Sequence, residues 1–116
     1  MAQPISILVV DDDASGRAML SLSLRQAGFS VEAAASGPEA LQLLRKNSYS
    51  CLITDARMSP MDGFELSRQA RGIKPDLRIL MMSAVHSAHD TTGYPIEKFL
   101  SKPVLIESIV GWIGRP

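Results

Sequence analysis

The stretch ISILVVDDD (residues 5–13) places three consecutive aspartates directly after a run of mostly apolar residues. The run over residues 5–10 is short and rich in β-branched side chains, which is typical of a strand buried on both faces. Asp11, Asp12 and Asp13 follow at once, and carboxylates this close repel one another unless a cation lies between them. The stretch therefore predicts a buried strand that ends in a cation-binding acidic cluster.

The overall composition limits the possible classes of protein. The chain has 116 residues, of which 46% are hydrophobic and 21% charged, and its formal net charge is zero. A chain of this length predicts one domain over residues 1–116. A neutral chain with only 5% aromatic residues offers neither a basic field nor a base-stacking surface. We therefore expect no direct binding to nucleic acid and none to a membrane.

The single cysteine and the first residues of the chain predict a cytoplasmic location. Cys51 is the only cysteine, so it cannot form an internal disulfide, and we expect it to be a small core residue in a reducing compartment. The first residues, MAQPIS, lack the charged and apolar regions of a signal peptide. No apolar run is long enough to span a bilayer.

Apolar runs alternate with amphipathic segments along the whole chain. Gly28 is placed to end the first helix, and Ser36 with Glu39 forms a capping-box pattern at the start of the second. The alternation predicts an α/β fold with a parallel, doubly wound sheet covered on both faces. The expected strands are residues 5–10, 31–34, 51–54, 78–82 and about 98–100, and the expected helices are 15–27, 36–47, about 63–71 and about 104–113.

Polar side chains follow four of the five predicted strands. In open parallel sheets, ligands bind beyond the carboxyl ends of the strands, and these ends carry Asp11, Asp12, Asp55, Ser83 and Lys102. Carboxylate oxygens suit Mg²⁺, whereas a lysine beside a divalent cation is expected to hold an anion such as phosphate. Ser83 offers a hydroxyl to a phosphoryl oxygen, and Asp55 is the best placed nucleophile. These residue types predict metal-assisted phosphoryl transfer.

Four motifs in order carry a family resemblance: ILVVDDD (7–13), LITDARMSPMDGFEL (52–66), ILMMSA (79–84) and FLSKP (99–103). Together they resemble the bacterial response-regulator receiver domains of two-component signalling, which are CheY-like. The resemblance covers essentially the whole chain. It implies a five-stranded flavodoxin-like sheet in the order 2-1-3-4-5.

The resemblance also implies a role for each matched residue. Asp55 would be the phospho-acceptor, and a sensor histidine kinase or phosphotransfer protein would supply its phosphoryl group. The domain would then switch its binding surface for a downstream output protein or domain, and it would catalyse no reaction beyond its own phosphorylation and dephosphorylation. The resemblance implies a Mg²⁺ ion, whose ligands would be Asp11, Asp12, Asp55 and the backbone carbonyl of Arg57. The other implied site residues are Ser83 as the switch hydroxyl, Lys102 as the phosphate-binding lysine, Phe99 as the switch aromatic and a cis peptide between Lys102 and Pro103.

The chain departs from the family pattern in three places. Pro60 lies one position later than usual in the loop after the acceptor, and Val85 is apolar where a polar residue is common. The interval between Ser83 and Lys102 is short, and only residues 88–92 are free to be helical before Gly93. Five residues of weak helix propensity make little more than one turn. We therefore expect a single turn or an irregular, mobile loop there instead of a full helix.

Competing interpretations remain open at this point. DDDAS (11–15) also fits the DxDx(S/T) opening of haloacid dehalogenase phosphatases, in which Asp11 would be the nucleophile and Asp13 the general acid. Asp13 is equally well explained as a helix cap. A receiver-like fold used purely for protein interaction is a second alternative, and a nucleotide-binding role is weaker because no glycine-rich phosphate loop follows the first strand.

His86 and His89 are expected to be exposed loop histidines. Both a free-standing receiver and a piece of a larger regulator or hybrid kinase are compatible with the sequence.

Overall fold

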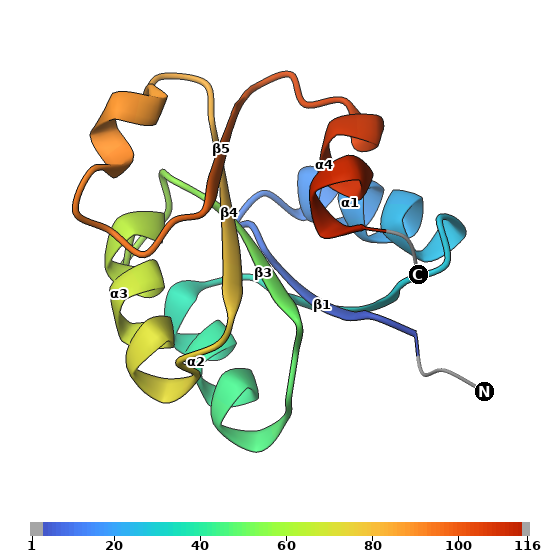
Figure 1. Ribbon diagram of the computed structural model, residues 1–116, viewed down its shortest axis with the longest axis horizontal. Helices are drawn as coiled ribbons and strands as arrows, with labels where there is room; N and C mark the ends of the chain where they lie inside the picture. Colours follow the sequence, from blue (N-terminus) through green and yellow to red (C-terminus); the bar gives the residue numbers. More distant parts are fainter. Residues whose placement is uncertain (1–3, 115–116) are drawn as a thin grey trace.

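The computed structural model describes residues 4–114, which form a five-stranded parallel sheet with helices on both faces (Figure 1). The strand order is β2-β1-β3-β4-β5, which confirms the predicted doubly wound fold. Residues 1–3 and 115–116 of the predicted domain lie outside the described residues. The strands are β1 (Ser6–Val10), β2 (Ser30–Ala34), β3 (Cys51–Asp55), β4 (Arg78–Ser83) and β5 (Lys98–Ser101). The helices are α1 (Ala14–Gln26), α2 (Gly37–Lys46), α3 (Gly63–Ile73), the short 3₁₀ turn η1 (Ala88–Thr91) and α4 (Ile106–Ile113).

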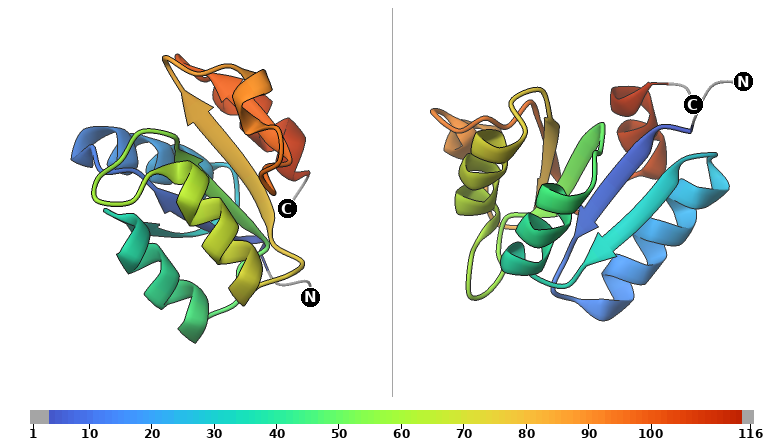
Figure 2. Two further views of the ribbon diagram at one scale, coloured as in Figure 1. Left: turned by 90° about the vertical axis from the view of Figure 1, so that its left-hand side faces the viewer. Right: turned by 90° about the horizontal axis from the view of Figure 1, so that it is seen from below.

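Side-chain alternation along the strands divides the interior into two apolar cores. In β1, Ile7 and Val9 belong to the core under α1 and α4, whereas Leu8 and Val10 belong to the core under α2 and α3. All four side chains are fully buried, as expected for a strand covered on both faces. Figures 1 and 2 show the two helix pairs on opposite faces of the sheet.

Local capping interactions determine where α1 and α2 begin. The Asp13 carboxylate accepts a hydrogen bond from the Gly16 N–H at 2.8 Å, so α1 starts at Ala14. Ser36 Oγ accepts from the Glu39 N–H at 3.3 Å, as the capping-box pattern predicts. The second half of the box differs, because the Glu39 carboxylate accepts from the Ala35 N–H instead of the Ser36 N–H.

The segment between β4 and β5 is irregular, as the sequence predicts. Its one regular element is η1, in which the Asp90 carboxylate accepts from the Ser87 N–H at 2.8 Å. Gly93 follows with a φ of +85°, a conformation that favours glycine and ends the turn. The shortened helix is therefore confirmed, and the mobility of the segment stays a prediction.

The parallel register brings the predicted site residues to one edge of the sheet. Asp55 is the last residue of β3 and lies opposite Met82, while Ser83 ends β4. The Lys102 N–H donates to the Ser83 carbonyl at 2.9 Å, which extends the pairing of β4 and β5 by one residue. Among the described residues, no helix is long and apolar enough to cross a membrane.

Candidate functional site

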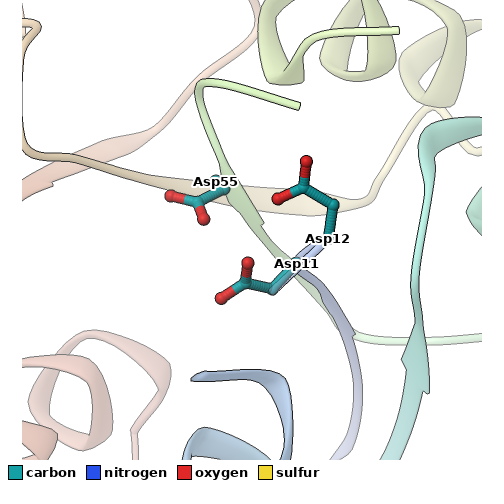
Figure 3. A group of neighbouring side chains, drawn as sticks. All are labelled: Asp11, Asp12 and Asp55. Carbon is teal, nitrogen blue, oxygen red and sulfur yellow. The ribbon is translucent and has the colours of Figure 1, made fainter. Parts of the chain in front are cut away.

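Three carboxylates converge at the carboxyl ends of β1 and β3 (Figure 3). Asp11 and Asp12 directly follow β1, and Asp55 ends β3. One oxygen from each residue lies within 4.8 Å of the others, which is close enough for the three to share a metal ion. Asp11 and Asp55 are buried, whereas Asp12 is exposed to solvent. An all-oxygen site of this kind fits Mg²⁺, since hard divalent cations prefer carboxylate ligands.

Asp11 is the deepest member of the trio. Its side chain accepts a hydrogen bond at Oδ1 from the Asp13 N–H at 2.9 Å, and its backbone carbonyl accepts one from the Arg17 guanidinium at 2.8 Å. The pKa of Asp11 is raised to about 6, mainly because the group is buried and in part because the Asp55 carboxyl lies beside it. The pocket therefore holds concentrated negative charge at a cost that a bound cation would relieve.

Lys102 supplies a positive charge directly to the acceptor candidate. Its Nζ lies 2.6 Å from Asp55 Oδ1, and its side chain is 37% exposed. The Lys102–Pro103 peptide is cis, as the resemblance implies. One ammonium against three carboxylates leaves the site with excess negative charge, so the lysine alone does not neutralise it.

A cavity of about 540 Å³ opens beside the carboxylates. Arg57, whose backbone carbonyl is the fourth predicted metal ligand, lies on its wall together with Asp12. Pro60 lies in the adjoining loop, where the Ser59–Pro60 peptide is cis. The remaining lining residues are Ala56, Met58, Ser59, Asp62, Phe64 and His86.

Ser83 and His86 form a contact that the sequence does not predict. His86 is half-buried and its Nδ1 lies 2.9 Å from Ser83 Oγ, so the expectation of an exposed loop histidine is wrong. The reason is tertiary, because the ring packs edge-on against Phe64 of α3 at 5.1 Å between centroids. Residues three apart in a loop give no sequence signal of such a contact. His89 is exposed, as expected.

Phe99 lies on the strand next to Ser83, but two residues away from the position that pairs with Ser83. It is half-buried on β5 opposite Met81, whereas Ser83 lies opposite Ser101. Val85 is 62% exposed on the loop that follows β4. The role of Phe99 as a switch aromatic stays a prediction.

Two further residues shape the site through the backbone. The carboxylate of Asp13 caps α1, which is the simpler of its two predicted roles. Gly63 packs against the acceptor strand, because a Cβ placed there would lie 2.1 Å from the Asp55 carbonyl oxygen. The sequence carries no signal for this role of Gly63, since its proximity to Asp55 depends on the return of the loop between them.

Comparisons with known proteins agree with this geometry. A family model described as "Response regulator receiver domain" matches residues 7–113. The response regulator MprA of Mycobacterium sp. (strain KMS) is 37% identical over 110 residues, which are 92% of this chain and 48% of MprA. The chain thus spans about half the length of this curated relative.

Solved structures show the same fold. The chemotaxis protein CheY4 of Vibrio cholerae superimposes with a TM-score of 0.89 and 31% identity, covering 96% of this chain and 97% of CheY4. A Burkholderia pseudomallei response regulator, crystallised with a phosphorylated aspartic acid, a calcium ion and citrate, has a TM-score of 0.85 and 25% identity. That match covers 95% of this chain and 66% of the Burkholderia chain. With its sheet order, its acidic edge and these similarities, the chain belongs to the family of response regulator receiver domains.

Proposed function

We propose that this domain accepts a phosphoryl group on Asp55 from a sensor histidine kinase or phosphotransfer protein, in a reaction that depends on Mg²⁺. The observation that carries the proposal is the 2.6 Å ion pair between Lys102 and Asp55 inside a group of three carboxylates. An incoming phosphoryl group needs positive charge on its oxygens. Lys102 and a cation bound by the three carboxylates would both supply it next to Asp55.

The covalent step is an exchange of one bond to phosphorus for another. A carboxylate oxygen of Asp55 attacks the phosphorus of the donor phosphohistidine, and a P–O bond forms as the P–N bond breaks. The leaving imidazole takes up a proton from solvent. The Lys102 ammonium already contacts the Asp55 carboxylate. It would contact the phosphoryl oxygens once the negative charge has moved to them. Ser83, at the end of the next strand, is placed to donate its hydroxyl to another phosphoryl oxygen.

The chain's own residues would hold the metal ion. Asp11, Asp12 and Asp55 provide the carboxylates, and the Arg57 carbonyl is the proposed backbone ligand. Mg²⁺ bound there would offset the negative charge that the phosphoryl group adds to the pocket. The phosphorylated aspartic acid and calcium ion of the Burkholderia pseudomallei response regulator support this assignment by similarity.

Intact-mass spectrometry after incubation with acetyl phosphate and Mg²⁺ tests the proposal. The wild-type domain should gain one acid-labile phosphoryl group, and Asp55→Asn should gain none. Asp12→Ala should weaken Mg²⁺ binding and slow the labelling, because it removes a charged ligand from a site with few protein ligands. Asp76→Asn is the matched control, since Asp76 is an exposed aspartate that precedes β4 at the opposite edge of the sheet.

The two alternative functions predict different results. A phosphatase with Asp11 as its nucleophile would keep the label in Asp55→Asn and lose it in Asp11→Asn. A domain used only for protein interaction would gain no label in any variant. Under the proposed function the domain catalyses only its own phosphorylation and dephosphorylation, and it passes the signal to an output protein or domain in the cytoplasm.

A further inference from the structure

Ser83 Oγ makes three hydrogen bonds, all to the loop that follows β4. It accepts from the backbone N–H of Val85 at 3.2 Å and from the backbone N–H of His86 at 3.0 Å. The third partner is His86 Nδ1 at 2.9 Å. The switch hydroxyl is therefore fully engaged before any phosphoryl group is present.

Counting donors and acceptors assigns the direction of the third bond. A hydroxyl oxygen has two lone pairs and one proton, and the two backbone N–H groups occupy both lone pairs. The Ser83 O–H must therefore donate to Nδ1, which requires the neutral imidazole tautomer with its proton on Nε2. In this arrangement the hydroxyl proton of Ser83 points to His86.

The His86 ring packs against Phe64 of α3, and Phe64 in turn packs against Tyr94 of the loop after η1. Phe64 packs edge-on against His86 at 5.1 Å and against Tyr94 at 5.0 Å, and the Arg68 guanidinium lies 4.8 Å from the centre of the Tyr94 ring. Figures 1 and 2 show this loop beside α3. His86 also lies on the wall of the cavity that contains Asp12 and Arg57.

We propose that His86 is a positioning residue that holds the Ser83 hydroxyl in the unphosphorylated domain and competes with the phosphoryl group for its proton. The inference rests on the proposed function, in which Ser83 donates to a phosphoryl oxygen on Asp55. That donation breaks the bond to His86 Nδ1. Because the ring also contacts Phe64, its release would pass the change from β4 to α3 and to the segment over residues 84–97.

Two substitutions at His86 separate the hydrogen bond from the ring contact. His86→Phe keeps an aromatic ring against Phe64 and removes the acceptor, whereas His86→Asn keeps an acceptor near the position of Nδ1 and removes the ring. The probe is beryllofluoride with saturating Mg²⁺, and its dissociation constant is measured from the amide NMR shift of Ala56. His86→Phe should bind about 3- to 10-fold more tightly than wild type, the factor expected for one competing hydrogen bond. His86→Asn should stay within about 2-fold of wild type, and so should the exposed control His89→Phe.

Nitrogen NMR of the unmodified protein tests the same inference without the probe. The His86 ring should be the neutral tautomer with its proton on Nε2, and its Nδ1 signal should lose the hydrogen-bond shift when beryllofluoride binds. A proton on Nδ1 in the unmodified protein overturns the inference, and so does equal affinity of His86→Phe and wild type. Equal tightening in His86→Phe and His86→Asn also overturns it, because the ring contact would then be the cause. If wild type binds beryllofluoride no better than Asp55→Asn, the proposed function fails, and the inference fails with it.

Discussion

At the scale of single residues, the site concentrates negative charge on buried groups. Asp11 is 4% exposed, and its pKa rises to about 6 because burial disfavours the ionised form. An acid with a raised pKa binds its proton more tightly in the folded state than in the unfolded state. Its contribution to stability is therefore greatest below its ordinary pKa of 3.8 and is lost as the pH rises to about 6.

Asp11→Asn should therefore stabilise the metal-free domain at neutral pH. The amide keeps an oxygen for the Asp13 N–H and removes the buried charge, so the free energy of unfolding at pH 7 should rise by about 2 kcal/mol. At about pH 4 the gain should largely vanish, because wild-type Asp11 is then mostly protonated when folded. Urea unfolding in a chelator at both pH values measures the difference, with Asp76→Asn as the exposed control. A gain of equal size at both pH values would show that it does not come from the titration of Asp11.

Gly63 and Gly72 provide a matched pair within α3. A Cβ at Gly63 would lie 2.1 Å from the backbone oxygen of Asp55, whereas a Cβ at Gly72 would meet nothing within 4 Å. Gly63→Ala should lower the free energy of unfolding by about 1–3 kcal/mol, because backbone cannot move aside as a flexible side chain can. Gly72→Ala should raise it by up to about 1 kcal/mol through helix propensity. Thermal unfolding of both variants decides the question, and similar melting temperatures would contradict the close approach of α3 to β3.

Among the segments that connect consecutive strands, the one between β4 and β5 is the least regular, because it holds the short 3₁₀ turn η1 where the others hold an α-helix. Its turn η1 has no buried residue, and the hydroxyls of Thr91 and Thr92 donate to the carbonyls of Ala88 and His89. Such side-chain bonds to the backbone compete with regular helical pairing, which favours an irregular segment. Hydrogen exchange over residues 86–97 should be fast in the unmodified domain and slower with beryllofluoride, because the switch would order the segment. Strong protection before beryllofluoride is added would contradict this mechanism.

Most elements could be predicted from the sequence because their signals are local. β-branched runs, capping residues and Gly28 locate strands and helix ends to within one or two residues, and the polar strand ends correctly anticipate the cluster of Asp11, Asp12 and Asp55. The contacts of His86 could not be predicted in this way, because its burial depends on Phe64, which lies on another element. The same holds for Gly63, whose constraint comes from the carbonyl of Asp55.

At the scale of the whole molecule, Arg78 connects the C-terminal helix to the far edge of the sheet. Its guanidinium donates to the carbonyls of Trp112 at 2.8 Å and Ile113 at 3.1 Å, at the end of α4. It also pairs with Glu97 at 3.0 Å and lies 4.4 Å from the centre of the Trp112 ring. Arg78 starts β4, the strand that ends at Ser83, so one strand links the anchor of α4 to the proposed switch.

Arg78→Met should therefore destabilise the domain while leaving the site residues in place. Loss of the two bonds to the end of α4 and of the cation–π contact should lower the free energy of unfolding by about 1–3 kcal/mol. Arg78→Lys should recover less than half of that loss, because an ammonium lacks the planar fork that reaches two carbonyls at once. Arg68→Met is the control, because Arg68 also has a cation–π contact, with Tyr94, and an exposed ion pair worth less than about 1 kcal/mol, whereas the two bonds to the end of α4 belong to Arg78. Urea unfolding followed by Trp112 fluorescence measures all three variants, and equal stability of Arg78→Met and Arg68→Met would show that Arg78 does not hold α4 against the sheet.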